Sequence, residues 1–416
     1  MTVITHHEVE KSALDSKTER RKRLGIRLVC VWAFLLSVQL PAFTEGQNLS
    51  LALSDLVLVV GILATFSSLR LRAKSWSVWH FAMPISLAAS AMFVGPLTRY
   101  TVANKVVGLV VLVVTYAFVT SHVWSWEDVA RVVRAFVGGM VFFTLLGIIR
   151  YVLSIEIPFT YCQTCDVRLI AFMPDPNLYG SLLVVALAAF VALDGSRVRL
   201  LPAALRWPSV LTLVAALALS SSRSAWLALG AVVLVALITR RRTALPALVG
   251  SIGAVLLVGF LIAPERVLDF AQLAGRTYTI DSRFTLMEQG MDAFLDNPLF
   301  GIGLGNSHEL FGQIIHNTLL WTAAELGVIG LIVFAGFLIW IARRLGEAFW
   351  AARAVHRPLV SFLIMGNAAM LAFSLSVEAF YQRHWWMLFA LTACASAVAT
   401  RDDPRSATTE PAFQSA

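Results

Sequence analysis

Apolar runs about as long as a membrane is thick recur along the whole chain. A transmembrane helix needs about 20 mostly apolar residues. Twelve runs approach that length, at 26–43, 49–66, 77–94, 105–122, 135–153, 173–193, 208–221, 224–239, 245–262, 316–341, 358–376 and 384–400. The pattern predicts an all-α polytopic membrane protein with about 12 transmembrane helices, of which those at 208–221 and 224–239 are short.

The composition agrees with a membrane protein. Hydrophobic residues make up 58% of the 416 residues and charged residues only 14%, whereas soluble domains average about 25% charged residues. A water-soluble core cannot hide this much apolar surface, so the bilayer is the expected solvent. We attribute the net charge of +8 to membrane topology and expect no nucleic-acid partner, because Lys and Arg collect on the cytoplasmic side of membranes.

The distribution of basic residues predicts the orientation. If the N-terminus is cytoplasmic, 24 of the 33 Lys and Arg residues fall on cytoplasmic segments, and both termini are cytoplasmic. The expected parts are a flexible cytoplasmic tail (1–25), helices one to nine (26–262), a large outer loop (263–315), helices ten to twelve (316–400) and a second flexible cytoplasmic tail (401–416). In a Gram-negative cell the outer loop is periplasmic.

The outer loop at 263–315 is expected to form a lid over a reaction site at the membrane surface. Its segment 278–300 has helical spacing, with Ser282 as a possible N-cap. The apolar stripe that would lie on the membrane consists of Phe284, Met287, Met291 and Phe294. Arg283 then falls in the first turn, where helix N–H groups and a guanidinium both favour phosphate oxygens. The alternative is a surface arginine paired with Asp281 or Glu288.

Arg223 is the second candidate for binding an anion. It lies between two apolar runs, in SSSRSAWLALG, and an ionisable residue at membrane depth usually faces a cavity and has a function. The alternative is an arginine that extends to the water at a hairpin tip. Arg168 and Arg276 lie on the same side and are further candidates.

His316 is the candidate general base. It begins an apolar run on the outer side, and a neutral imidazole can accept the proton of a hydroxyl nucleophile near pH 7. The alternative is a hydrogen-bonding residue at a helix end, and His308 is a second candidate. The chain has no HxxxH or HExxH pattern there, so we predict no metal site.

Three smaller features lie on the same side. The turn GIGLGN at 301–306 could bring backbone amides to a ligand or be a flexible connector. Asn177, in MPDPN, is a possible helix cap. Cys162 and Cys165 are expected to form a small disulfide loop if the compartment is oxidising.

The run HNTLLWTAAELGVIG resembles the signature of bacterial O-antigen ligases, with His316, Asn317, Gly327 and Gly330 at the matching positions. DNPLFGIGLGN, SSSRSAWLAL and MPDPN are similar to other elements of the wider ligase and polymerase superfamily. The resemblance covers about 165–340, and the earlier runs match only in hydropathy.

The resemblance implies a glycosyltransferase with a C-type (GT-C) fold in the bacterial inner membrane. Such enzymes move a glycan from undecaprenyl pyrophosphate to an acceptor on the outer face, which in ligases is the lipid A–core. The reaction is metal-independent, needs no cofactor and inverts the anomeric centre. By position, His316 would match the essential histidine, and Arg223 and Arg283 the arginines that hold the pyrophosphate; Arg168 and Arg276 are further candidates for that anion.

Three other functions fit parts of the same pattern. An O-antigen polymerase uses the same donor, but such enzymes often have two sizeable outer loops, and only one is expected here. A protein O-oligosaccharyltransferase often has an additional soluble portion. A transporter for an anionic substrate would need charges along its path. The apolar runs are almost free of charged residues, and Asp55 and Glu325 are the exceptions.

Overall fold

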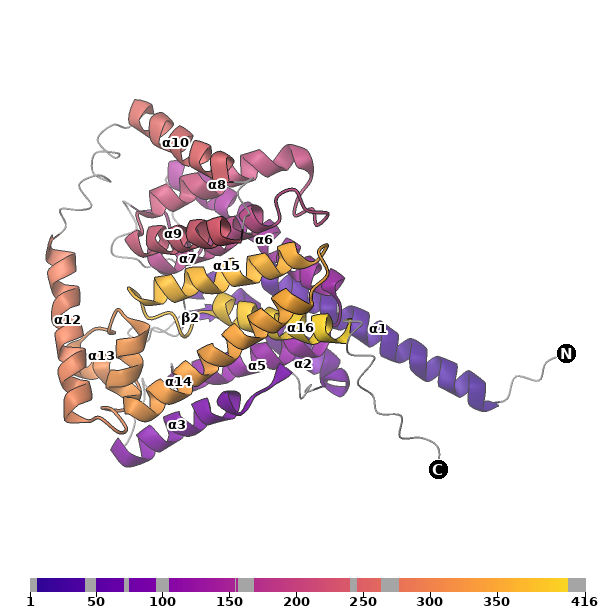
Figure 1. Ribbon diagram of the computed structural model, residues 1–416, viewed down its shortest axis with the longest axis horizontal. Coiled ribbons are helices and arrows are strands. Elements are labelled where there is room, and N and C mark those ends of the chain that lie inside the picture. Colours follow the sequence, from indigo (N-terminus) through magenta and orange to yellow (C-terminus); the bar gives the residue numbers. More distant parts are fainter. Residues whose placement is uncertain are drawn as a thin grey trace.

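The computed structural model is a bundle of helices (Figure 1). It describes residues 6–41, 50–70, 75–94, 105–153, 155, 168–239, 245–262 and 277–402. The α-helices are α1 (His6–Phe34), α2 (Leu53–Thr65), α3 (Val78–Val94), α5 (Val107–His122), α6 (Trp126–Val152), α7 (Pro176–Ala192), α8 (Ala203–Ser220), α9 (Arg223–Ile238), α10 (Leu245–Ile262), α12 (Thr277–Asp296), α13 (Asn306–Phe311), α14 (Thr318–Ala351), α15 (Arg357–Ser374) and α16 (Arg383–Arg401).

Two short strands are the exception to an all-helical fold. Strands β1 (Gln39–Pro41) and β2 (Ser50–Ala52) pair antiparallel, with Gln39 opposite Ala52. A 3-10 turn, η1 (Phe66–Ser68), follows α2. Apart from these strands, the structure has the predicted fold class, that of a helical membrane protein.

In the described part of the chain, four helices are long and apolar enough to cross a membrane: α6, α8, α14 and α15. Shorter apolar helices occupy Leu53–Ser68, Val78–Val94, Val107–His122, Pro176–Ala192, Arg223–Ile238 and Leu248–Leu257. Each apolar run predicted from the sequence overlaps a helix. The number of spans and the GT-C fold stay predictions.

The expected flexible tail at 1–25 is wrong for residues 6–25, because α1 begins at His6. This segment is rich in Glu, Lys and Arg, which are good helix formers. Glu19 and Arg23, one turn apart, also form an ion pair at 3.5 Å, and such pairs stabilise helices slightly.

Helices α7 and α16 form the centre of the bundle. Nearly every residue of both is buried, as expected for helices that are apolar all round. Helix α7 packs on α8, α9 and α15, and α16 packs on α5, α14 and α15. The hydroxyl of Ser181 on α7 and Nε2 of His384 on α16 are 3.0 Å apart.

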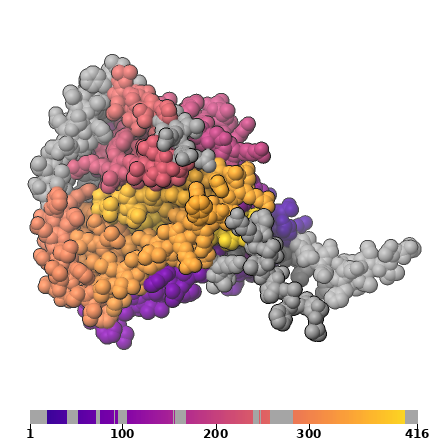
Figure 2. Space-filling view, in the orientation of Figure 1, coloured from indigo at the N-terminus to yellow at the C-terminus, as the bar shows by residue number. Residues whose placement is uncertain are grey.

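Helices α12 and α13 lie at one end of the long axis, away from the start of α1, and α12 runs across the direction of α14 (Figure 1). Their surface continues into that of α14 (Figure 2). On α12, Leu286, Gly290 and Ala293 are buried. A Cβ at Gly290 would lie 2.8 Å from Cδ1 of Ile315, so the glycine lets α12 approach the start of α14 closely.

The predicted apolar stripe of α12 lies mainly away from the bundle. Phe284 is 61% exposed and Met291 47% exposed, whereas Met287 and Phe294 are half-buried. An exposed apolar stripe fits a helix at a membrane surface, and its contact with the membrane stays a prediction.

Candidate active site

His316 directly precedes α14, and its neighbour Asn317 caps that helix. The Oδ1 atom of Asn317 accepts a hydrogen bond from the backbone N–H of Leu320 at 3.0 Å. Its Nδ2 donates to the carbonyl of Leu375, after the end of α15, at 3.0 Å. One side chain therefore starts the helix and joins it to the segment between α15 and α16.

Thr318 makes a second connection to the same segment. Its hydroxyl donates to the carbonyl of Val377 at 3.0 Å and accepts from the N–H of Ala379 at 2.9 Å. Asn317 and Thr318 together fix the backbone that presents the half-buried His316.

Arg223 is the first residue of α9. The preceding Ser222 caps the helix by accepting from the N–H of Ala225 at 3.3 Å. The same hydroxyl donates to Oδ1 of Asn177 at 2.9 Å. The starts of α7 and α9 are thereby held together.

Asp175, and not Asn177, is the cap of α7. Its Oδ1 accepts from the N–H groups of Asn177 and Leu178 at 2.7 and 3.0 Å, and Pro176 occupies the first helical position, where proline is favoured. The interpretation of Asn177 as the cap is therefore wrong, since its amide oxygen accepts from Ser222.

Arg283 lies in the second turn of α12, not in the first. The helix begins at Thr277, so Ser282 is inside it and does not cap it. The segment before Ser282 continues the helical period, which extends the helix beyond the predicted start. The N-terminal N–H groups of α12 therefore do not surround Arg283, and its neighbours are contributed by other helices.

Four of the residues described above interact electrostatically. Burial lowers the pKa of Arg283 below its usual value, the positive charge of Arg223 lowers it further, and Asp175 opposes this. Burial also lowers the pKa of His316, followed by the charge of Arg283, again opposed by Asp175. Arg283 therefore interacts electrostatically with both Arg223 and His316, although the three residues are far apart in sequence.

Positive charge is concentrated at the start of α9. Arg223 adds a positive charge at the N-terminus of α9, where the helix dipole is already positive. Arg283 adds a second charge close enough to be destabilised by the first. Helix N-termini and guanidinium groups together are suited to phosphate oxygens, so a negatively charged ligand would relieve the repulsion.

Asp175 was missed as a site residue by the sequence analysis. Its charge acts on both Arg283 and His316. The signal in the sequence was the Asp-Pro pair at the start of an apolar run, which marks an N-cap followed by a first helical residue. That pattern explains a cap, but it does not show which distant residues the carboxylate faces.

Arg168 has two structural partners. Its Nε donates to the carbonyl of Ser220 at 2.9 Å and its Nη2 to that of Ser221 at 3.2 Å. Ser221, at the end of α8, has a left-handed backbone with φ 49°, and Arg168 satisfies the carbonyls at this helix end. The other predicted anion-binding residue, Arg276, and the pair Cys162 and Cys165 lie outside the described residues.

The turn GIGLGN is buried and neither binds a ligand with its amides nor forms a loose connector. Gly301, Gly303 and Gly305 all have positive φ angles, of 68°, 97° and 83°. The residues at 301–305 are buried, and three of their amides donate to residues of α14. His308 follows on α13.

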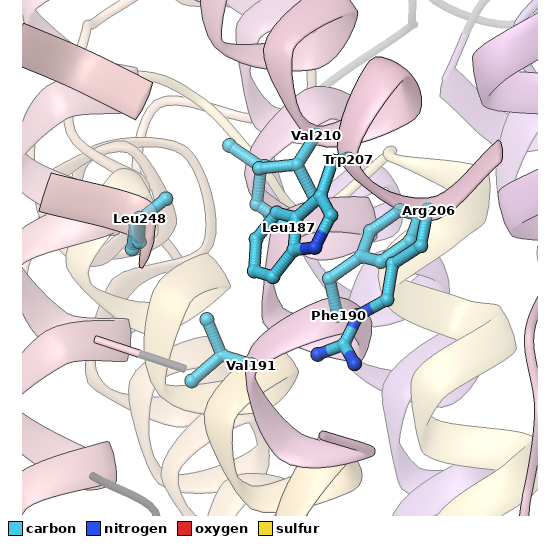
Figure 3. A pocket seen from close by; sticks show the side chains of 7 residues that line it. All are labelled: Leu187, Phe190, Val191, Arg206, Trp207, Val210 and Leu248. Atoms are coloured by element: carbon cyan, nitrogen blue, oxygen red, sulfur yellow. The ribbon is translucent and has the colours of Figure 1, made fainter. Parts of the chain in front are cut away.

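Figure 3 shows a separate, small pocket between α7, α8 and α10. Its lining is apolar apart from Arg206, which forms an ion pair with Asp194. It contacts the second half of α7, from Leu187 to Val191, whereas Asp175 caps the first turn. This pocket is therefore not part of the candidate site.

Among the residues that the structure covers, no three His, Cys, Asp or Glu side chains gather as metal ligands would. The absence of a metal from the reaction stays a prediction, as do the roles assigned to the individual site residues.

Comparison with protein families gives a match over residues 208–335, about a third of the chain, to the family described as O-Antigen ligase. This region is similar to that family. None of the curated proteins compared matches the chain. The matched region runs from α8 to the first half of α14 and includes Arg223, Arg283 and His316, whereas Asp175 lies before it.

The match to the O-antigen ligase family supports a glycan-transfer function of the ligase or polymerase type. Such a function involves, in general, a lipid-linked glycan and a lipid-associated acceptor. Together with the apolar helices, the match supports a membrane-bound transferase.

Proposed function

We propose that this protein is an O-antigen ligase of a Gram-negative inner membrane. It transfers the O-antigen glycan from undecaprenyl pyrophosphate to the lipid A–core on the periplasmic face. The observation that supports the proposal is that Arg283 on α12 interacts electrostatically both with Arg223, at the start of α9, and with His316, before α14.

In the proposed reaction an acceptor hydroxyl attacks the anomeric carbon of the donor sugar. The hydroxyl proton passes to the imidazole of His316, and a new glycosidic C–O bond forms. The bond between the anomeric carbon and the pyrophosphate breaks on the opposite side, which inverts the configuration. The electron pair of that bond leaves with the pyrophosphate.

The arginines stabilise the leaving group. As the bond breaks, negative charge grows on the pyrophosphate, and Arg223 and Arg283 are fixed beside it. Groups that are already oriented toward developing charge in a partly buried site contribute much of enzymatic rate enhancement. Asp175 balances part of the positive charge while no donor is bound and remains close to His316.

His316 is suited to accept the proton. Burial and the charge of Arg283 lower its pKa, so the imidazole is neutral near pH 7 and its lone pair is available. A positioned general base contributes about 10²–10⁴ in rate.

The buried charges favour an enzyme over a transporter. Asp55 accepts from Nε of Arg383 at 2.7 Å and pairs with it at the starts of α2 and α16. Glu325 accepts hydrogen bonds from a turn near the start of α14. Both carboxylates thus have partners near helix starts and do not line a path along the middle of the bundle.

The proposal is tested with His316→Ala. We expect the variant to insert and fold but to transfer glycan from purified lipid-linked donor to lipid A–core about 10²–10⁴ times more slowly. His308→Ala is the matched control and should retain activity. Removing either Arg223 or Arg283 should cost about 10²–10³ in rate.

Normal transfer by His316→Ala would exclude the mechanism. A deletion strain separates the related functions on a gel of lipopolysaccharide. Uncapped lipid A–core with intact lipid-linked polymer identifies a ligase, whereas loss of the polymer itself identifies a polymerase.

A further inference from the structure

Helix α14 is broken at Gly327, which has φ 65° and ψ −164°. The break frees two carbonyls of the preceding turn from their helical partners. The carbonyl of Ala324 accepts from the N–H of Ile302 at 2.8 Å, and that of Glu325 accepts from the N–H of Gly303 at 3.1 Å. The glycine-rich turn after α12 thus supplies the donors that the broken helix lacks.

Hydrogen bonding also runs in the other direction. The N–H of Val328, just after the break, donates to the carbonyl of Pro298 at 2.8 Å. The two backbones are so close that a Cβ on Gly327 would lie 2.3 Å from the carbonyl oxygen of Leu299, and a Cβ on Gly301 would lie 2.4 Å from the carbonyl carbon of Glu325. Both positions require glycine, for space as well as for their positive φ angles.

The side chain of Glu325 completes this contact. It is 1% exposed, its Oε2 accepts from the N–H of Gly305 at 2.6 Å, and its Oε1 accepts from the hydroxyl of Ser307. We call the paired segments 298–307 and 324–328 the clasp. The five bonds described above join the chain leaving α12 to the first half of α14.

Lys105 is the cation that faces the Glu325 carboxylate. It is itself buried, 8% exposed, and its ammonium lies 5.0 Å from the ring centre of Trp321 and 4.6 Å from that of Tyr381. A buried carboxylate is costly unless it is paired and hydrogen-bonded. Hydrogen bonds from Gly305 and Ser307 give each of the two carboxylate oxygens a partner.

The position of the clasp connects it to the candidate site. Arg283 lies on α12, whose end leads directly into 298–307, and His316 immediately precedes the turns of α14 that end at Gly327. The clasp therefore determines how far apart and in what orientation the elements carrying these two residues lie. Small misplacements of reacting groups are expensive in rate.

We propose that Glu325 is a positioning residue that locks α12 onto the broken helix α14 and so holds Arg283 in register with His316. The role in transfer rests on the proposed function, whereas the locking of the two segments does not.

The test is Glu325→Gln in the full-length protein. The amide keeps the size of the side chain, but only its oxygen can accept, so one of the bonds from Gly305 and Ser307 is lost or, at the serine hydroxyl, must reverse its direction. The weakened hydrogen bonding of this buried group should speed amide hydrogen exchange of the 301–307 segment by about ten- to a hundredfold. Glu347→Gln is the matched control, because Glu347 lies on the same helix and also accepts from a serine, Ser396.

Transfer kinetics on the same samples test the positioning role. We expect Glu325→Gln to lower kcat by about 10²-fold with a smaller change in KM for the acceptor, and Glu347→Gln to behave as wild type. Wild-type exchange at 301–307 in Glu325→Gln would overturn the clasp. Faster exchange with unchanged kcat would overturn the positioning role.

Two further outcomes keep these conclusions separate. If Glu325→Gln does not insert into the membrane, Ser307→Ala replaces it, because this change removes a single hydrogen bond to the same carboxylate. Ser307→Ala should give smaller changes of the same sign. Unchanged hydrogen exchange at 301–307 in Ser307→Ala would overturn the clasp. If Glu325→Gln exchanges faster at 301–307 but His316→Ala still transfers glycan, the clasp is upheld and the proposed mechanism is rejected.

Discussion

The imidazole of His316 is held neutral by its surroundings. Burial and then the Arg283 charge lower its pKa, and Asp175 raises it. A lowered pKa means that the neutral form, which is the form competent as a base, persists to a pH below the usual value of about 6.5. Proposed base activity is therefore lost only as the pH falls through this lowered pKa.

In a plot of kcat/KM against pH, Asp175→Asn should shift the acidic limb to lower pH. Removing the carboxylate removes the one interaction that raises the pKa of His316, and asparagine can still cap α7. The measurement is the pH dependence of kcat/KM, which reports the free enzyme. Arg283→Gln should shift the acidic limb of the remaining activity to higher pH, because it removes a charge that lowers the pKa of His316.

Asp296→Asn is the control, since Asp296 is exposed at the end of α12. It should leave the limb unchanged. If Asp175→Asn and Asp296→Asn gave the same profile as wild type, the limb would not belong to His316, and the assignment of the general base would be wrong.

At the scale of elements, α12 depends on one glycine for its contact with α14. A Cβ at Gly290 would already meet Ile315 at 2.8 Å and Leu320 at 3.4 Å. Gly290→Leu should therefore push α12 outward and destabilise its packing by about 1–3 kcal/mol. Transfer activity should fall although Arg283 and His316 are intact.

Gln289→Leu is the matched control, because residue 289 is exposed on the same helix. The measurements are glycan transfer and protease sensitivity of α12 in detergent. Equal activity of Gly290→Leu and wild type would show that the packing of α12 on α14 is not needed for the site.

The elements show which features the sequence could predict. Apolar runs placed the helices well, since the period and length of a run are local properties. The start of α12 and the cap of α7 were misplaced, because several polar residues in each segment can cap equally well. The positive φ angles of Gly301 and Gly327 have meaning only with the partner segment present, and no local pattern reveals that partner.

The residues of the candidate site also differ in whether the sequence could predict them. His316, Arg223 and Arg283 could be proposed from charge in an apolar context and from the resemblance to a family. Asp175 could not, because its effect depends on where α9 and α12 lie relative to the start of α7. Arg168 carried the same charge signal as Arg223, yet it holds the end of α8.

At the scale of the whole molecule, orientation in the membrane is the main prediction. Gln313, near the candidate site, and Arg353, between α14 and α15, are both exposed. In a variant without the native cysteines, Gln313→Cys should react with a membrane-impermeant thiol reagent in intact spheroplasts, since the basic residues predict that it faces outward. Arg353→Cys should react only after permeabilisation. The reverse pattern would place the site on the cytoplasmic face.

The hydrogen bonds of Asn317 and Thr318 to the segment after α15 have a consequence for protein engineering. The region that matches the family ends at residue 335, yet the backbone beside His316 is fastened to residues 375–379. In a chimaera that exchanges only the matched region with a relative, Asn317 and Thr318 would come from one protein and their hydrogen-bond partners at 375–379 from the other. Exchanges of acceptor specificity should instead carry the last two helices along with the histidine.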